Sequence, residues 1–331
     1  MQTIHVIRFG ALGDLCLTGW TLARLAQGPQ REGRRVVLVT KERFAALAEQ
    51  FTGVDAVESL AEPGRLGDLV RLAANLRRQH PDTIIDAHGV LRSRLLLGLL
   101  GRRPQARLRK DTVARLRLLQ GGAESTALRQ HLRQRLDSVM DRAALPSGEA
   151  VPPLAHLAPA TPPAATLGLS PGAQWDTKRW PESHWVDLAR RALDHGDRIR
   201  IFLGPREELW FPGGPLEQAL AGADGVEFIR GRSLLEAARA LAGCRRLVCN
   251  DSGLMHLSEA VGTPVTAFFG PTVRAFGYAP VLPDSRLLEV ADLNCRPCSR
   301  NGKKPCHRGD LACLTGISAD DAWRAVGSEA R

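Results

Sequence analysis

The most informative segment of this chain is RLVCNDSGLMHLSEAVGTPVTAFFGPT, residues 246–272. Its apolar start at residues 246–249 is typical of a buried strand, and the Asp251 and Ser252 that follow are good helix N-caps. A helical segment then ends at a Gly-Thr-Pro sequence, and a second apolar strand covers residues 265–269. This order of strand, capped helix and strand predicts one repeat of a parallel α/β sheet.

The start of that helix is also a candidate anion site. Unpaired backbone N–H groups and the helix dipole at such a terminus favour an anion, typically a phosphate. The alternative interpretation is an ordinary N-cap in an α/β domain that binds nothing. This segment alone does not decide between the two, and other parts of the chain must be considered.

Strands and helices alternate on the N-terminal side of this segment. The first half predicts strands at 4–9, 35–40 and 83–87, and helices at 14–26, 42–50, 66–80 and 91–100. The second half predicts strands at 166–169, 198–203 and 226–229, and helices at 185–192, 214–221 and 233–242. This rhythm predicts an α/β fold with two Rossmann-like domains facing a central cleft, because ligands of such sheets bind beyond the carboxyl ends of the strands.

A proline-rich stretch separates the two halves. It contains five prolines, at positions 146, 152, 153, 162 and 163, which would interrupt any helix. We therefore predict an N-terminal domain at residues 1–150, a linker at 151–165 and a C-terminal domain at 166–331. The C-terminal domain ends in a cysteine-rich tail at residues 295–313.

Composition indicates a soluble globular protein. The chain has 331 residues, of which 44% are apolar and 24% are charged, and no apolar run reaches the roughly 18 residues of a membrane span. The first residues enter a strand directly and lack the basic, apolar and cleavage regions of a signal peptide. We expect a cytoplasmic protein, in which disulfide bonds are disfavoured.

Charge indicates an anionic partner. The net charge is +10, and residues 102–142 hold eleven Lys and Arg against four Asp and Glu. Nucleic acid, an anionic membrane surface and a phosphorylated substrate all fit such a stretch, and so does a solvated helix face. The stretch has no aromatic residue on which bases could stack, and the whole chain has one tyrosine. This argues against a single-stranded nucleic acid as the partner.

The first candidate site follows the first predicted strand. Gly10 and Gly13 form a Gly-x-x-Gly spacing, so the dinucleotide fingerprint Gly-x-Gly-x-x-Gly is absent. Asp14 comes next, at the start of the first helix. It either caps the helix or acts as a general base that removes a proton from a nucleophile.

Two further candidate sites lie in the second half. Lys178 and Arg179 follow the first strand there, in a loop where a cation could meet a phosphate. Glu207 and Glu208 come just after another strand, where carboxylates commonly bind ribose hydroxyls. The alternative for both acids is favourable placement in the first turn of a helix.

Taken together, these motifs resemble the bacterial lipopolysaccharide heptosyltransferases, which form glycosyltransferase family 9. The resemblance is carried by Gly13-Asp14, by KRWP at 178–181, by DSGLMHL at 251–257 and by FGPT at 269–272. Their order and spacing match over nearly the whole chain. The resemblance implies a GT-B fold, with the acceptor bound by the N-terminal domain and the nucleotide sugar by the C-terminal one.

The resemblance also implies an activity and its partners. It implies inverting transfer of heptose from an ADP-heptose donor to the inner core of a lipopolysaccharide precursor, with no metal needed for catalysis. The acceptor would be a Kdo- or heptose-bearing lipid A, and the enzyme would sit at the inner face of the inner membrane, an anionic surface. The basic stretch fits a phosphorylated acceptor, and nucleic acid is not expected as a partner.

Site residues follow from the same resemblance. It implies that Asp14 is the general base and that Lys178 stabilises the diphosphate leaving group. The substrate-binding residues it implies are Gly13, Glu207 (Glu208 being the less favoured choice), Arg232, Ser233, Asp251, Ser252, Gly253 and His256. Other interpretations stay open: another nucleotide-activated sugar, a protein acceptor, or a non-catalytic protein that binds nucleic acid or an anionic surface.

The tail places four cysteines, Cys295, Cys298, Cys306 and Cys313, within nineteen residues. Four thiolates would suit a tetrahedral zinc or iron ion with a structural role, although the spacing is not that of a standard zinc ribbon. Disulfides and a redox pair are the alternatives. The other three cysteines, Cys16, Cys244 and Cys249, are predicted to be small buried apolar residues.

Overall fold

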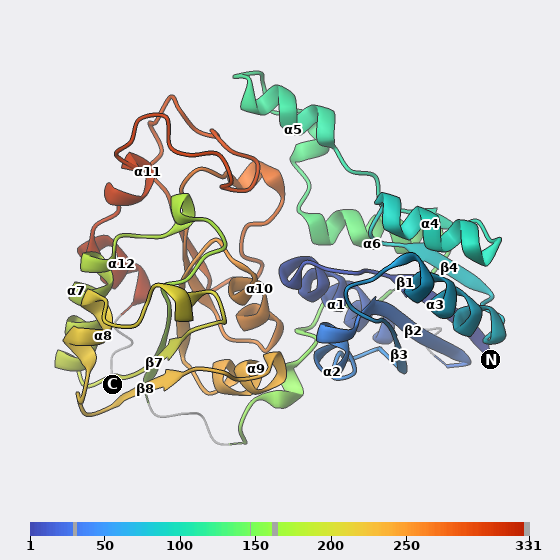
Figure 1. Cartoon of the computed structure of the whole chain (residues 1–331), viewed down its shortest axis with the longest axis horizontal. Coiled ribbons are helices and arrows are strands. Elements are labelled where there is room, and N and C mark those ends of the chain that lie inside the picture. The colour runs from blue at the N-terminus through green and yellow to red at the C-terminus, as the bar shows by residue number, and fades with distance from the viewer. Residues whose placement is uncertain (29–31, 146, 161–164, 328–331) are drawn as a thin grey trace. The chain divides into compact units, whose positions relative to one another are not determined.

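The computed structural model describes residues 1–28, 32–145, 147–160 and 165–327, and the chain forms two compact units (Figure 1). The first unit contains Met1–Asp111 and Gln130–Ala155. The second contains Thr112–Arg129 and the chain from His156 onward. No pattern in the sequence predicted that residues 112–129, within the first half, would group with the second unit.

Residues 151–155 of the predicted linker belong to the first unit. Leu154 is fully buried, and the Pro153 carbonyl accepts a hydrogen bond from the Thr52 amide at 2.8 Å. A short 3₁₀ helix, Ala155–Leu157, follows. The predicted linker prolines 146, 162 and 163 lie outside the described residues.

The first unit is built on a five-stranded parallel sheet in the order β3-β2-β1-β4-β5. Its strands are β1 (Gln2–Ile7), β2 (Arg34–Lys41), β3 (Ala56–Leu60), β4 (Thr83–Asp86) and β5 (Ala106–Arg107). Its helices are α1 (Leu12–Ala26), η1 (Glu42–Phe44), α2 (Ala45–Ala48), α3 (Leu66–Arg78), α4 (Leu91–Leu100) and α6 (Leu132–Arg142).

Right-handed crossovers place α1 and α2 on one face of this sheet and α3 and α4 on the other, because the strand order reverses at β1. Helices α3 and α4 pack against each other over a core that includes Ile7, Val39, Leu72 and Leu96, all at most 3% exposed. The spacing of leucines along both helices buries one stripe of each, which is why the sequence predicted them well.

The second unit contains a six-stranded parallel sheet in the order β11-β10-β9-β6-β7-β8. Its strands are β6 (Thr166–Ser170), β7 (Arg198–Phe202), β8 (Val226–Ile229), β9 (Arg246–Asn250), β10 (Val265–Phe268) and β11 (Arg286–Leu288). Its α-helices are α5 (Thr112–Leu119), α7 (Glu182–Asp194), α8 (Pro215–Leu220), α9 (Leu234–Ala242), α10 (Gly253–Ala260), α11 (Ala312–Thr315) and α12 (Ala319–Val326). Its 3₁₀ helices are η2 (Thr126–Leu128), η3 (Ala155–Leu157), η4 (Asp176–Lys178), η5 (Glu207–Leu209) and η6 (Arg274–Phe276), with η3 at the boundary between the units.

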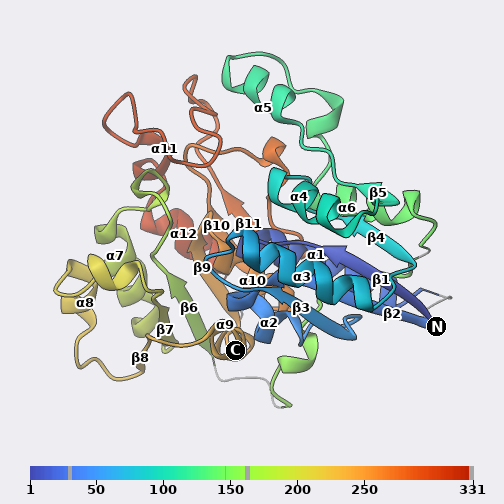
Figure 2. The same ribbon diagram turned by 45° about the vertical axis from the view of Figure 1, so that its right-hand side comes forward.

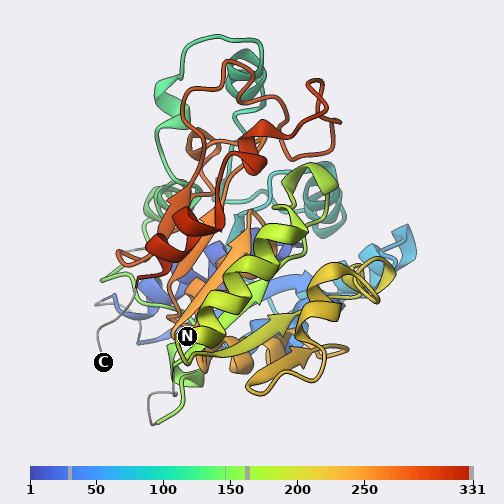
Figure 3. The same cartoon turned by 90° about the vertical axis from the view of Figure 1, so that its left-hand side faces the viewer.

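One face of this sheet is covered by α7, α8 and α12. Figure 3 shows that face, with α7 in yellow-green beside α12 in red, and the two helices are in contact. Trp180 lies in this core at 2% exposure and stacks on Phe268, with ring centroids 4.3 Å apart. Trp180 is therefore a core residue of the second unit, and Cys16, Cys244 and Cys249 are buried as predicted.

Several elements were not predicted from the sequence. The unpredicted elements include β3, β5, α5, α6, β11 and α12. Strands β5 and β11 have two and three residues, too few for a period to be recognised. Within the described ranges, no helix has both the length and the apolar character needed to cross a membrane.

Candidate functional site

Each sheet has one point where the strand order reverses. In the first sheet β1 lies between β2 and β4, and in the second β6 lies between β7 and β9. The crossovers on the two sides of such a point run to opposite faces, which leaves a crevice at the carboxyl ends of the strands. The predicted site residues Asp14, Lys178 and Asp251 all follow strands that meet at these two points.

In the second unit, Lys178 and Asp251 form an ion pair. The Lys178 Nζ lies 2.5 Å from Asp251 Oδ2, and both side chains are 12% exposed. The same ammonium donates to the Asp251 carbonyl at 3.2 Å, and the Thr272 hydroxyl donates to Asp251 Oδ2 at 2.7 Å. Three of the motifs that carry the family resemblance thus meet at one carboxylate.

Asn250 holds these loops in place, and the sequence did not single it out. It is fully buried at the end of β9, and its Oδ1 accepts a hydrogen bond from the Trp180 amide at 3.0 Å. Its Nδ2 donates to the Pro171 carbonyl at 2.8 Å. One amide therefore links the loop after β6 and the segment after Lys178 to β9. A polar residue at the end of an otherwise apolar strand was the available signal.

The start of α10 has the features of an anion site. Ser252 is the N-cap, and Gly253 is the first helical residue. The Ser252 Oγ is buried and makes no hydrogen bond within the described residues. His256, one turn further on, is 4% exposed, with its ring edge-on to Tyr278. An N-cap hydroxyl that does not cap its own helix remains available to a ligand.

Glu207 lies against the first loop of the second unit. Its Oε2 accepts a hydrogen bond from the Gly204 amide at 2.9 Å. A Cβ at Gly172 would lie 2.2 Å from Glu207 Oε1, so only glycine leaves room for this carboxylate. Glu208 is exposed. Of the two acids, Glu207 is the one that lies against the loop after β6.

Arg232 and Ser233 do not join these residues through any hydrogen bond within the described ranges. Ser233 is the N-cap of α9 and exchanges hydrogen bonds with Glu236, three residues later. Arg232 pairs with the same Glu236 at 3.5 Å, and both residues are exposed. Their contacts are those of an ordinary capping box.

In the first unit, Asp14 has two fixed partners. Its Oδ2 accepts a hydrogen bond from the Ala11 amide at 3.1 Å, which caps α1. Its Oδ1 lies 2.7 Å from Arg8 Nη2, and Arg8 also donates to the Ala87 carbonyl. Gly13 is buried in the first turn of α1. The capping role is thus observed, and the carboxylate is still 20% exposed.

A histidine that the sequence did not flag lies beside this pair. His88 follows β4, and its Nδ1 is 3.4 Å from the Phe9 amide. Burial, with a contribution from Arg8, lowers the pKa of His88 to about 4, so the ring is neutral at ordinary pH. Asp86 accepts hydrogen bonds from the His88 and Gly89 amides and fixes this loop.

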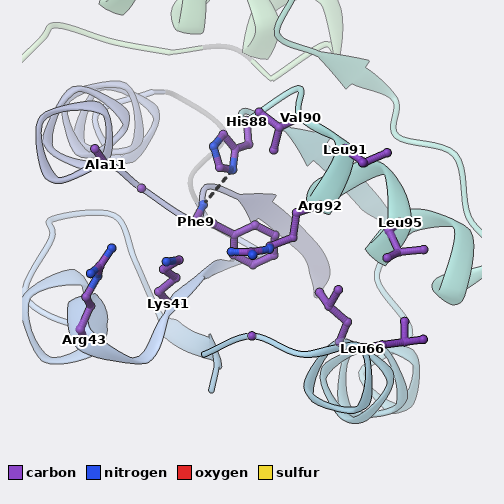
Figure 4. Close-up of a pocket in the computed structure, with 13 residues that line it drawn as sticks. Phe9, Ala11, Lys41, Arg43, Leu66, His88, Val90, Leu91, Arg92 and Leu95 are labelled. Atoms are coloured by element: carbon purple, nitrogen blue, oxygen red, sulfur yellow. Dashed lines mark hydrogen bonds between the residues drawn. The ribbon is translucent and has the colours of Figure 1, made fainter. Parts of the chain in front are cut away.

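A pocket of about 670 Å³ opens at the same edge of the first sheet (Figure 4). Phe9, Ala11 and His88 line it near Asp14, and Lys41, Arg43 and Arg92 provide cations. Leucines of α3 and α4 line the opposite side (Figure 4). The pocket therefore suits a molecule with both anionic and apolar parts.

The basic stretch at 102–142 is not a continuous free surface. Arg107 pairs with Asp86 at 2.8 Å, and Arg135 pairs with Asp111 at 2.5 Å. Arg115 donates to the Phe276 carbonyl at 3.0 Å. Several of these cations thus have structural partners, which reduces the charge that the stretch can offer to a ligand.

The structure does not support the predicted zinc or iron site in the tail. Across the described residues, no group of three or more His, Cys, Asp or Glu side chains is arranged to hold a metal ion. All four tail cysteines are free thiols. Cys313 is buried in α11, and burial raises its pKa to about 11, which disfavours the thiolate that a metal needs.

Comparison with known proteins gives concordant matches. The sequence profile of glycosyltransferase family 9 (heptosyltransferase) matches residues 69–307. The lipopolysaccharide heptosyltransferase 1 of Pseudomonas aeruginosa is 32% identical over 320 residues, which covers 92% of this chain and 87% of that protein.

Two solved structures share the fold. A family 9 glycosyltransferase from Veillonella parvula superposes with a TM-score of 0.75 at 20% identity, covering 98% of this chain and 96% of its own. The Escherichia coli heptosyltransferase WaaC, solved with ADP-2-deoxy-2-fluoro heptose, gives 0.71 at 20% identity, covering 98% and 99%.

Proposed function

Because the chain belongs to glycosyltransferase family 9, the heptosyltransferases, we propose that it transfers heptose from ADP-heptose to the inner core of a lipopolysaccharide precursor. The chain is a glycosyltransferase with the GT-B fold of two Rossmann-like domains. The single observation that carries the proposal is the cluster of Lys178, Asp251 and Thr272 at the switch point of the second sheet. It joins three segments that are far apart in the sequence.

The donor site that we propose is in the second unit. The ADP diphosphate would lie at the start of α10, where Ser252 and the free N–H groups can donate hydrogen bonds. Glu207, for whose carboxylate Gly172 leaves room, would accept hydrogen bonds from the ribose hydroxyls. Asp251 and His256 would face the sugar, and Arg232 and Ser233 would approach the adenine. The donor in the WaaC structure, an ADP-heptose analogue, supports this choice of nucleotide.

The transfer that we propose inverts the anomeric carbon. An acceptor hydroxyl attacks this carbon from the face opposite the diphosphate, and its proton passes to Asp14. The bond between the anomeric carbon and the phosphate oxygen breaks, and ADP leaves with its electron pair. Lys178 and the N–H groups of α10 stabilise the charge that develops on the β-phosphate, so the chemistry requires no metal ion. Arg8 keeps the Asp14 carboxylate in one orientation.

The acceptor would bind to the first unit, at the pocket beside Asp14. Lys41, Arg43 and Arg92 suit the carboxylates and phosphates of a Kdo- or heptose-bearing lipid A. Because this acceptor carries acyl chains, the protein would work as a peripheral enzyme at the anionic inner face of the inner membrane.

Two measurements test the proposal. Calorimetry of the purified protein with ADP-heptose, and with UDP-, GDP- and dTDP-sugars as controls, tests the donor. A transfer assay on Kdo-bearing lipid A, with and without excess chelator, tests the reaction and its metal independence. We expect selective binding of ADP-heptose and chelator-insensitive transfer with inversion at the anomeric carbon.

The contrary outcomes are distinct from one another. Preference for another nucleotide would overturn the donor but leave the fold and the Asp14 chemistry. Loss of transfer in chelator would overturn the metal-independent mechanism alone. Binding without transfer to any truncated lipopolysaccharide would overturn the acceptor.

A further inference from the structure

Exposed apolar side chains gather on α3 and α4 at the mouth of the first unit's pocket. Leu91 is 82% exposed, Leu66 60%, Val70 47% and Leu95 43%. The two helices are in contact and run side by side in Figures 1 and 2. The three leucines also line the pocket, as Figure 4 shows. We call these four side chains the apolar rim.

The apolar rim is separate from the core of the unit. Leu69, Leu72, Leu96 and Leu97 on the inward faces of the same helices are at most 3% exposed and fill the core. The rim residues are spaced four apart on each helix, so they form a second apolar stripe on the outer face. A helix that only covers a sheet needs one such stripe, and a contiguous exposed patch marks an interaction surface.

Cations surround this surface. Lys41, Arg43 and Arg92 line the same pocket, and Arg94 is exposed on α4. Lys41 and Arg43 share one carboxylate, Glu62, at 3.2 and 3.6 Å. Arg92 and Arg94 have no carboxylate partner in the part of the chain that the structure describes. The patch is therefore apolar at its centre and positive around it.

We propose that the apolar rim, with Arg92 and Arg94, docks onto a bilayer surface that carries anionic headgroups. Leucines beside arginines are what an interfacial helix requires, because the leucines enter the acyl boundary while the guanidinium groups stay with the phosphates. Each cation near such a surface adds attraction that salt screens. This rests on the proposed function in one respect: a lipid-borne acceptor would then reach the adjoining pocket from the same surface.

Vesicle binding by the full chain tests the docking surface. Sedimentation with phosphatidylglycerol–phosphatidylethanolamine vesicles is compared with sedimentation with phosphatidylcholine vesicles. We expect the wild type to partition onto the anionic vesicles at least about tenfold more strongly. The double variant L91S/L95S should lose about tenfold or more of that binding, because two of the inserted side chains become polar.

Two further variants separate the contributions. Leu209→Ser is the matched control, since Leu209 is an 85% exposed leucine in η5 of the second unit, and its vesicle binding should equal that of the wild type. R92Q/R94Q should bind anionic vesicles more weakly than the wild type at low salt, and its binding should depend less steeply on ionic strength. The melting temperature should stay near the wild-type value in all variants, because these side chains contribute little to the core.

Several results would overturn the proposal. Equal binding of the wild type to anionic and neutral vesicles would contradict the docking surface. Wild-type-like vesicle binding by L91S/L95S would contradict it too. A wild-type dimer in light scattering that L91S/L95S converts to a monomer, without a change in vesicle binding, would assign the rim to a second copy of the chain. None of these readouts depends on heptose transfer, so they remain informative even where the transfer assay fails.

Discussion

Lys178 and Asp251, which lie 73 residues apart in the sequence, form a nearly buried ion pair at the switch point of the second sheet. An acidic side chain beside a diphosphate would by itself repel the ligand. Here the Asp251 carboxylate pairs with Lys178 and also accepts a hydrogen bond from the Thr272 hydroxyl. Both partners offset its negative charge in the absence of the nucleotide sugar. The pair therefore holds Lys178 at the start of α10, where the leaving group would develop its charge.

Replacing Lys178 with alanine should weaken ADP binding by about tenfold or more, since charged hydrogen bonds are worth about 1.5–3 kcal/mol. The change also leaves the Asp251 carboxylate without its cation, so part of the lost ADP affinity comes from repulsion between this carboxylate and the diphosphate. The double variant K178A/D251N should therefore bind ADP more tightly than Lys178→Ala alone. Calorimetry measures both, with Lys304→Ala as an exposed-lysine control. An unchanged kcat/KM in Lys178→Ala would remove this residue from the site.

Gly172→Ala should reproduce the effect of Glu207→Gln on donor binding. The added methyl group would lie 2.2 Å from the Glu207 carboxylate and displace it from the ribose position. We expect both variants to weaken ADP binding by about tenfold. Glu208→Gln is the matched control and should bind ADP normally, because Glu208 is exposed. A larger loss of ADP affinity in Glu208→Gln than in Glu207→Gln would assign the ribose contact to Glu208 instead.

Asp14→Asn should keep donor binding and lose turnover by about 10²–10⁴-fold, the usual contribution of a general base. Asparagine can still accept the Ala11 hydrogen bond that caps α1, so the helix start is preserved. The measurement is kcat for transfer alongside calorimetric ADP-heptose binding. Asp141→Asn changes an exposed carboxylate of α6 and serves as the control. Turnover near the wild-type rate in Asp14→Asn would contradict the base assignment.

Stability should fall as the pH drops from about 6.5 towards 4. Burial lowers the pKa of His5 from 6.5 to about 4, and the residue is 1% exposed in β1. Between these values the unfolded chain binds a proton that the folded chain does not. The free energy of unfolding therefore decreases with falling pH, by at most about 3 kcal/mol for this group.

Denaturation midpoints measured across this pH range check the effect. His5→Gln should show a shallower decrease than the wild type, although His88 retains its own share. The exposed His156→Gln should follow the wild type. The same slope in His5→Gln and the wild type would show that His5 does not carry the effect.

The sequence predicted the second sheet better than the small elements around it. Helix α4 of the first unit and strand β8 of the second begin and end at the predicted residues, and glycines lie close to the ends of both. Strands β5 and β11 were missed, since edge strands of two or three residues form only when a neighbouring strand supplies their hydrogen bonds. The grouping of residues 112–129 with the second unit depends on Arg115 and its contacts with Phe276 and Tyr278, which no local pattern reveals.

The candidate site also contains residues that the sequence suggested and residues that only the structure revealed. The sequence made Asp14, Lys178, Glu207 and Asp251 candidates, because polar residues that follow strand ends commonly bind ligands in α/β folds. Asn250 and His88 were missed because their importance depends on which loops they contact. The structure does not support a metal site at the tail cysteines, and their spacing could not show that Cys313 is buried in α11.

Periodicity and short motifs are local properties of the chain, and they were enough to predict the class of fold, the two Rossmann-like halves and the family. Only the tertiary structure decided which residues meet: Lys178 with Asp251, Asp14 with Arg8, and the apolar rim with its arginines. The physical reason is that strand order sets these contacts. The carboxyl ends of β6 and β9 are neighbours in the sheet, although Arg246, the first residue of β9, comes 76 residues after Ser170, the last residue of β6.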